Sequence, residues 1–216
     1  MPSVDYIRRH LVRSGVAGAG LVLFAPLITH AAAITPRQSE GPFYPTRLPL
    51  DKDNDLVSVA GRSELAQGEI VDVVGRVVNE RGRPIANARI EIWQCNQFGR
   101  YHHPRDQRNA PLDPNFQGYG QFVTKTDGAY RFRTIKPVPY PGRAPHIHFA
   151  ISGAGFEKLI TQMYVAGAPE NQRDYLLNRI ADEKLRRSLI VDFQKSAAAT
   201  PVGQFDIVLA TDGRYG

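Results

Sequence analysis

The chain has 216 residues, of which 42% are hydrophobic and 22% are charged, as in an ordinary globular protein. These proportions exclude a disordered chain, a collagen, a coiled coil and a multi-span membrane protein. The formal net charge is +6, but Lys and Arg are scattered and form no basic arm, so no nucleic-acid partner is expected.

The beginning of the chain has the layout of an export signal. Arg8 and Arg9 give a basic start, Val16–Ile28 is apolar and uncharged, and Ala31–Ala33 offers a small-residue cleavage site. The apolar run is shorter than the roughly 20 residues of a membrane span, and the paired arginines indicate the twin-arginine route. We therefore expect residues 1–33 to direct export to the periplasm or beyond, with no stable membrane span after cleavage. An uncleaved anchor and a chance basic start are the alternatives.

The next segment, residues 34–68, is irregular and punctuated by proline. Its aromatic stretch Pro42–Pro45 indicates an ordered arm rather than a free tail. From residue 69 to residue 216, short β-branched or alternating runs are separated by turn residues, as in an antiparallel β-sandwich. The expected strands are Ile70–Val78, Ala88–Gln94, Tyr130–Ile135, His146–Ser152, Leu159–Val165 and Phe205–Leu209. The fold class is therefore all-β, with an N-terminal arm.

One late helix is expected over about Asn171–Ile190, because apolar residues recur there at roughly helical spacing among charges. The single cysteine, Cys95, excludes an intrachain disulfide and any multi-cysteine metal site. It lies in a strand-like run and is interpreted as a small core residue.

Four histidines remain once the expected signal is set aside, and two of them form a possible metal pair. His146 and His148 are separated by one residue at the start of a strand, so both imidazoles face the same side. Imidazole is a common metal ligand, although a solvated or core histidine pair is the alternative. A cupin uses a similar pair with a glutamate four or five residues later. The first acid here is Glu157, which disfavours a cupin.

Further motifs accompany this pair. A tyrosine follows Gly-Arg at Tyr101, another stands between prolines at Tyr140, and Arg143–His148 reads Arg-x-x-His-x-His. Together with Glu40–Pro45, these motifs resemble those of the intradiol ring-cleavage dioxygenases, in particular the protocatechuate 3,4-dioxygenase branch of that family. The resemblance extends over most of residues 73–165 and resumes near the C-terminus.

The resemblance implies a ferric iron site and names its residues. The implied ligands are Tyr101, Tyr140, His146 and His148. Arg143 falls where the family has an arginine beside the substrate, and Gln162 where it has a supporting glutamine. Tyr140 falls where the family has the ligand that substrate displaces. Two phenolates and two imidazoles form a hard, anionic nitrogen–oxygen set, which suits Fe(III). The other tyrosines, among them Tyr164, are expected to pack rather than react.

The implied reaction is cleavage of a catechol-type ring by O2 to a cis,cis-muconate-type dicarboxylate, with Arg143 stabilising negative charge on the ring. Only Pro141 and Gly142 separate Tyr140 from Arg143, a shorter loop than in the protocatechuate enzymes, so the catechol is left open. Residues 34–68 are too few for the helical dimerisation domain of catechol 1,2-dioxygenases, and a homo-oligomer of another kind stays open.

Two other functions stay open at this point. An exported β-sandwich could be a binding module that retains a relic metal site. The same two histidines could also serve a zinc or copper site. Bound iron with oxygen uptake on a catechol would separate the enzyme from the binding module, and a visible tyrosinate-to-iron absorption band would separate iron from zinc or copper.

Overall fold

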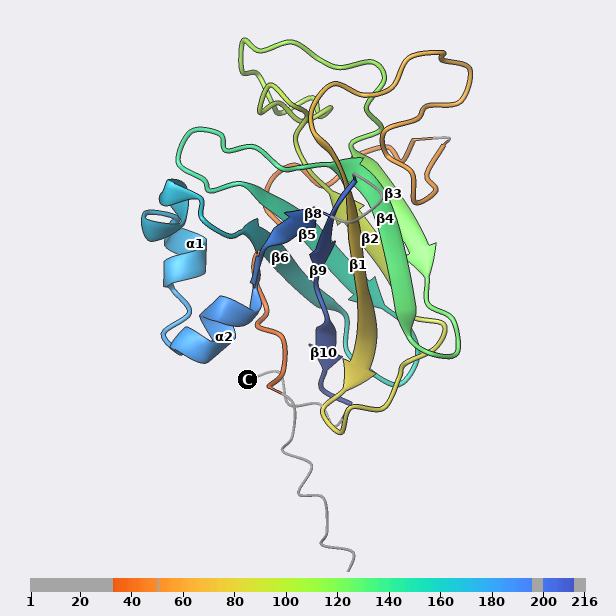
Figure 1. The fold of residues 1–216 in the computed structure, drawn as a ribbon, viewed down its shortest axis with the longest axis vertical. Coiled ribbons are helices and arrows are strands. Elements are labelled where there is room, and N and C mark those ends of the chain that lie inside the picture. Colours follow the sequence, from red (N-terminus) through yellow and green to blue (C-terminus); the bar gives the residue numbers. More distant parts are fainter. Residues whose placement is uncertain (1–32, 50, 196–199, 212–216) are drawn as a thin grey trace, which may run out of the picture.

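The structure is a computed structural model that describes residues 33–49, 51–195 and 200–211. Two five-stranded β-sheets pack face to face, and two short helices lie beside one edge (Figure 1). All but the last residue of the expected export signal, residues 1–33, lies outside the described residues. Within the described residues, no helix is long and apolar enough to cross a membrane.

The first sheet is built around its longest strand. Strand β4 pairs along one edge of β1, whereas β9 and β10 pair with successive parts of the other edge, and β8 pairs with β9. The bounds are β1 (Ile70–Asn79), β4 (Ala129–Ile135), β8 (Phe193–Lys195), β9 (Pro201–Gln204) and β10 (Ile207–Leu209).

The second sheet has the strand order β3-β2-β5-β6-β7, which puts β5 in its centre. The bounds are β2 (Arg89–Trp93), β3 (Tyr119–Val123), β5 (His146–Ser152), β6 (Leu159–Val165) and β7 (Ile190–Val191). In the register of this sheet, Trp93, His148 and Gln162 lie side by side on three neighbouring strands. This row forms part of the functional site.

The six expected strands are present, but the expectation of a purely antiparallel sandwich is wrong. Strands β9 and β10 run parallel to β1, and β7 runs parallel to β6. Parallel neighbours need a long crossover connection. The segment between β6 and β7 is such a crossover connection. Strand β7 was not expected, because it has too few residues to show an alternating pattern. Strands β3, β8 and β9 were likewise not expected.

The expectation of one helix over residues 171–190 is also wrong. The segment contains a 3-10 turn η1 (Pro169–Gln172) and the helices α1 (Tyr175–Asn178) and α2 (Glu183–Ser188). Aspartate interrupts the helical pattern twice, because its side chain favours a helix start over a helix interior. Asp174 accepts hydrogen bonds from the backbone N–H groups at the start of α1, and Asp182 does so for α2.

The core between the sheets consists of aromatic and β-branched side chains from both. Phe149 of β5 contacts Phe205, which precedes β10, with ring centres 5.1 Å apart. Both are buried, and burying each such side chain contributes about 1.5–3 kcal/mol. Gly75 of β1 allows the backbone of Phe205 to lie this close to the strand, because a Cβ at position 75 would be 2.0 Å from the carbonyl oxygen of Phe205. The core therefore fixes β1 and the last strands closely against each other.

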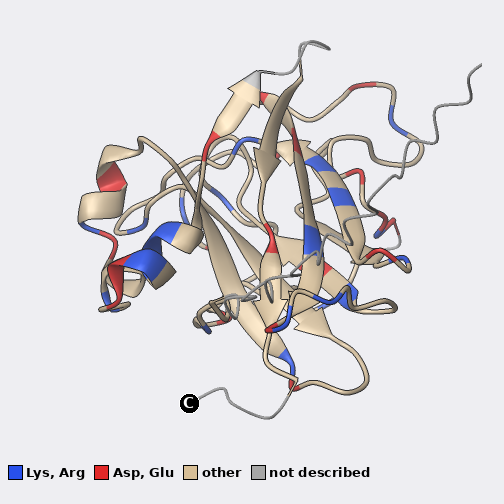
Figure 2. Ribbon diagram, turned by 60° about the horizontal axis from the view of Figure 1, so that its bottom comes forward, with Lys and Arg blue, Asp and Glu red and all other residues tan. Residues whose placement is uncertain are grey.

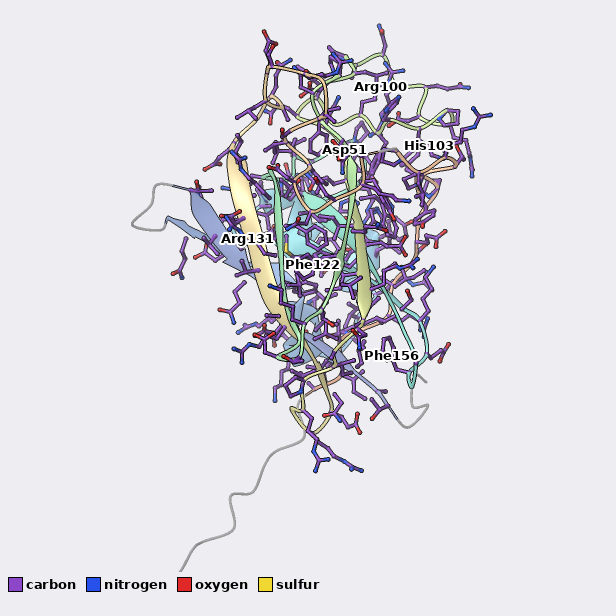
Figure 3. All side chains as sticks on the ribbon, turned by 90° about the vertical axis from the view of Figure 1, so that its right-hand side faces the viewer. Asp51, Arg100, His103, Phe122, Arg131 and Phe156 are labelled. Carbon is purple, nitrogen blue, oxygen red and sulfur yellow. The ribbon has the colours of Figure 1, made fainter. Side chains whose placement is uncertain are left out.

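The N-terminal arm has no helix or strand in its described residues, and it is tied to both sheets. The backbone N–H of Thr35 donates to Val208, that of Gln38 to Ile160 and that of Leu56 to Arg133. The arm begins beside β10, and its later part gathers with the loops after β2 and β4 at the opposite end of the sandwich (Figure 1). In Figure 3, Arg100 and His103 lie towards this end, and Phe156 lies towards the other.

Positive charge is not concentrated on one face of the described surface. Lys and Arg lie on strands, helices and loops and alternate with Asp and Glu (Figure 2).

Candidate metal centre

The two histidines lie on the central strand of the second sheet. His146 and His148 are each 1% exposed and face the same side of β5. Their Nε2 atoms are 3.2 Å apart. The Nδ1 atom of His146 donates to the carbonyl oxygen of Ala144 at 2.6 Å, which leaves the Nε2 lone pair free. The ring of His148 is stacked on that of Trp93, with centres 4.8 Å apart and planes at 7°. Both imidazoles are therefore held with a nitrogen aimed at one point.

Tyr101 reaches this point from the loop after β2. The side chain of Asn96 accepts from the N–H groups of Phe98 and Arg100 and so shapes the turn before it. Asp106 accepts from the N–H of Tyr101 itself at 2.7 Å. The side chain is 3% exposed, and its hydroxyl has no hydrogen-bond partner among the described residues. A buried hydroxyl left unpaired costs free energy, which indicates a missing ligand.

Tyr140 reaches the same point from a tight turn. The N–H of Arg143 donates to the carbonyl of Tyr140 at 2.9 Å, and Gly142 has φ +82°. A type II turn with Pro141 and Gly142 at its two central positions has this geometry. The Tyr140 hydroxyl lies 3.5 Å from His146 Nε2, and the rings of Tyr140 and Tyr101 have centres 5.8 Å apart. The turn thus places the second phenol beside the histidines.

These four side chains have the chemistry of a metal site. Within the described residues, no three His, Cys, Asp or Glu side chains gather in a way that could hold a metal ion. A metal at this point would therefore need the phenol oxygens as well as the two imidazoles. Two nitrogen and two oxygen donors in a buried place, one of them without a partner, fit a hard ion such as Fe(III).

Burial sets the protonation of the donors. It lowers the pKa of His146 to about 3, helped by the positive charge of Arg143, and lowers that of His148 well below its usual value. Both imidazoles are therefore neutral and able to ligate at neutral pH. Burial raises the pKa of Tyr101 far above 10 and also raises that of Tyr140. A cation must displace the phenol protons when it binds, so binding releases protons.

Arg143 is held beside the donors by two side chains. Its Nε donates to Asp174 at 2.8 Å, and its Nη2 donates to Gln162 at 2.5 Å. Asp174 is buried, and it also accepts from the N–H of Ala144 and caps α1. Burial alone would raise the pKa of Asp174. The hydrogen bonds from Ala144 and Leu177 and the charge of Arg143 together have the larger opposite effect, so the pKa of Asp174 lies below its usual value. The structure thus brings Arg143 and Gln162 together as expected and adds Asp174.

Tyr164 is buried in the core, as expected, and its hydroxyl also joins the hydrogen bonds around Arg143. Its hydroxyl lies 3.1 Å from the side-chain oxygens of Gln38 and Gln162 and accepts from Arg143 at 3.3 Å. The contacts of Asp174 and Tyr164 with Arg143, and of Gln38 with Tyr164, could not be found from the sequence, because the segments that make them are far apart along the chain. One signal was available: Tyr164 and Gln162 share a face of their strand.

The arm covers the donors. Gly41 has φ +72°, and a Cβ there would lie 3.2 Å from Cε1 of His148. Phe43 is stacked on Tyr101 with ring centres 4.7 Å apart. The backbone carbonyl of Ser39 accepts from Gln162 at 3.0 Å. The aromatic stretch is therefore ordered, as expected, and it excludes water from one side of the site.

Two cavities open on either side of Tyr140. One of about 300 Å³ is lined by Gly142, Arg143, Asp174 and their neighbours. The other, of about 400 Å³, lies towards the loop after Tyr101 and is lined by Phe43, Arg105, Asp106, Gln107, Arg108, Tyr140 and Pro141. A larger cavity of about 840 Å³ is lined by Tyr101 and Trp93, but Tyr101 is buried. Tyr140 is the one donor residue of the four that is only half-buried.

One expectation outside the donor set is confirmed. Cys95 is buried and free, and burial raises the pKa of its thiol to about 12, so it is an inert core residue. His102 is exposed on the loop after Tyr101. Its neighbour His103 is buried edge-on against Phe43, with ring centres 5.7 Å apart.

A family model described as Dioxygenase matches residues 39–211. The chain is 43% identical over 149 residues to the protocatechuate 3,4-dioxygenase beta chain of Burkholderia cepacia, covering 60% of this chain and 63% of that one. It is 33% identical over 147 residues to a hydroxyquinol 1,2-dioxygenase of Rhizobium sp., covering 60% and 46%. The chain thus spans less than two thirds of the length of these curated relatives.

Solved structures share the fold. The dioxygenase domain of a dioxygenase–carbohydrate-binding fusion protein from Streptomyces sp. SirexAA-E superposes with a TM-score of 0.64 and 30% identity. The match covers 82% of this chain and 99% of that domain.

Proposed function

The chain belongs to the intradiol ring-cleavage dioxygenase family, and we propose that it cleaves the ring of a catechol-type diphenol with O2 to give a cis,cis-muconate-type dicarboxylate. One observation carries this proposal most directly. Two buried imidazoles and two phenol rings gather in one place, and Arg143 is held next to them by Gln162. All of these groups come from a single chain, so no second copy is needed to complete the described site.

Tyr101, Tyr140, His146 and His148 would hold the metal, and their chemistry supports Fe(III). When bound, the ferric ion supplies the Lewis acidity that holds the diphenol oxygens and makes the ring reactive towards O2. The chain contributes neutral imidazoles, because burial keeps His146 and His148 unprotonated.

The chain also provides a place for a substrate proton. A diphenol must lose protons to bind a cation, and Tyr140, which lines two cavities, is the one donor residue of the four that is only half-buried. Tyr140 Oη is therefore proposed to accept one proton as substrate enters. Tyr101 is buried beneath Phe43 and stays in place.

Arg143 supplies positive charge at a fixed position. Asp174 and Gln162 hold its guanidinium fork, so its donors need no reorganisation as negative charge develops on the substrate ring. Arginine remains charged at any working pH.

Oxygen uptake tests this proposal. The purified, iron-loaded protein is mixed with catechol or substituted catechols in an oxygen electrode, and the product is identified by mass spectrometry. We expect uptake of one O2 per diphenol and a ring-opened dicarboxylate that contains both oxygen atoms. Diphenol binding without oxygen uptake would instead favour the binding module. Stoichiometric zinc or copper in the native protein would favour the other metal site.

We further propose that residues 1–33 direct export by the twin-arginine route, to the periplasm or outside the cell. The support is the sequence itself, with Arg8 and Arg9 ahead of a weakly apolar run. Changing both residues to lysine keeps the charge but removes the arginine pair. We expect this double variant to stay in the cytoplasm at its full precursor mass, as measured by fractionation and immunoblotting. Unchanged export of the variant would exclude this route.

A further inference from the structure

His148 lacks the kind of hydrogen bond that orients the other histidine of the donor set. The Nδ1 atom of His146 donates to a backbone carbonyl, whereas the Nδ1 atom of His148 is buried and has no hydrogen-bond partner among the described residues. A metal-binding imidazole is ordinarily oriented by a hydrogen bond at its other ring nitrogen. The plane of the His148 ring is therefore set by the side chains packed against it.

The ring stacked on His148 is that of Trp93. Their centres are 4.8 Å apart, their planes are at 7°, and both side chains are buried. The indole Nε1 atom of Trp93 also has no hydrogen-bond partner in the described part of the chain. Because no hydrogen bond at these two nitrogens resists a tilt of the stack, a tilt of Trp93 would be passed on to His148.

Tyr44 of the N-terminal arm packs against the indole. The ring centres of Tyr44 and Trp93 are 5.0 Å apart and their planes are at 88°, an edge-to-face arrangement that aromatic pairs favour. The Tyr44 hydroxyl donates to Oε1 of Glu91 at 2.9 Å. Glu91 and Trp93 are two residues apart on β2 and so point to the same face of the strand. Tyr44 is thus tied to the same strand that carries Trp93.

A second phenol fixes the carboxylate that holds Tyr44. Tyr119 of the neighbouring strand β3 is buried, and its hydroxyl donates to the same Oε1 atom of Glu91 at 2.6 Å. Glu91 is itself buried, and a carboxylate in such a place needs hydrogen-bond donors because burial without them is costly. Glu91 is therefore a fixed anchor for the hydroxyl of Tyr44.

We propose that Tyr44 is a positioning residue for the metal ligand His148 and acts through Trp93. Anchored on Glu91, the ring of Tyr44 fixes the indole, and the indole fixes the plane of the imidazole. The arm thus contributes to metal retention without providing a ligand. This inference deepens the proposed function and rests on it, because it requires that His148 and the other three donors hold a metal.

The rate of iron release tests this role without turnover. The iron-loaded protein is mixed with an excess of a strong Fe(III) chelator, and the decay of the visible absorption band follows the loss of iron. Trp93→Leu removes the stack and should release iron about 10- to 100-fold faster, since losing the support of a ligand lowers metal affinity by about that factor. Trp93→Phe keeps a flat ring and should stay within about threefold of the wild type. Tyr44→Phe keeps its ring but loses the anchor, and should release iron about two- to tenfold faster.

Tyr130→Phe is the matched control. Tyr130 is a buried phenol of the first sheet, and its hydroxyl donates to the carbonyl oxygen of Phe205. Thermal unfolding of the iron-free proteins should show lower stability for both Tyr44→Phe and Tyr130→Phe, because each loses one hydrogen bond. Only Tyr44→Phe should release iron faster and shift the visible band.

This pair of variants decides the matter even if Trp93→Leu does not fold. A release rate of Tyr44→Phe equal to that of the wild type, or an equal acceleration in Tyr130→Phe, would overturn the role of Tyr44 and leave the proposed function standing. A wild-type protein that holds no iron would instead overturn the proposed function, and this role with it.

Discussion

Replacing His148 by alanine is expected to remove most of the iron and with it the oxygen uptake. His148 lies at the centre of the second sheet, and its Nε2 is 3.2 Å from that of His146. Loss of groups that only support metal ligands typically lowers metal affinity by about 10- to 100-fold. Loss of a ligand itself should cost at least as much. Elemental analysis of the purified variant measures the iron, and an oxygen electrode measures the activity.

The matched control is His102→Ala, which removes an exposed imidazole next to Tyr101. It should keep both the iron and its visible absorption. Tyr101→Phe separates ligand loss from a packing defect, because phenylalanine preserves the stack on Phe43 and removes only the unpaired hydroxyl. We expect this variant to remain folded, to lose iron and to lose the tyrosinate-to-iron band. Full iron content in both His148→Ala and Tyr101→Phe would show that the metal is held elsewhere.

The sequence predicted six of the strands because each of them lies in a run of five or more residues with a clear pattern. His146–Ser152 is such a run, and its alternation also placed the two imidazoles on one face. The late helix was predicted wrongly, because hydrophobic spacing does not show where an aspartate side chain captures the backbone. Asp174 interrupts the helix to bind Arg143 and Ala144, so the error falls at a functional residue.

The residues of the site that the sequence predicted are those that stand in short motifs. Tyr101, Tyr140 and the histidines stand in short motifs that survive without knowledge of the fold. Gln38 and Asp174 do not, because their contacts with the site depend on where the arm and the crossover fold back. Contacts made across sequence separations of more than a hundred residues, such as Gln38 with Tyr164, leave no local pattern.

Removing the side chain of Arg143 should affect turnover but not the metal. The guanidinium makes no contact that the donor set needs, because the backbone N–H of Arg143 makes the turn with Tyr140 and survives the change. Asp174 would lose one hydrogen bond and keep those from Ala144 and from α1. Arg143→Ala is therefore expected to fold and to keep its iron and colour.

The expected loss in turnover follows from the position of the fork. Asp174 and Gln162 hold it at 2.8 Å and 2.5 Å, so its charge is already in place when negative charge develops on the substrate. Fixed donors of this kind contribute about 10²–10³ in rate each, and we expect Arg143→Ala to lower kcat by about that factor. Arg143→Lys should recover only part of it, because lysine keeps the charge but cannot form the planar fork that reaches both partners.

Steady-state oxygen uptake at saturating diphenol, normalised to iron content, measures this effect on kcat alone. Arg173→Ala is the comparison, since it removes an exposed arginine that lines the same cavity, and its effect should be several-fold smaller at most. A fall in iron content that matches the fall in activity would make Arg143 a support for the metal site. Near-normal kcat in Arg143→Ala would show that the ring needs no positive charge from this side. Because the fork is held by two buried partners rather than by solvent, the loss should persist when the ionic strength is raised.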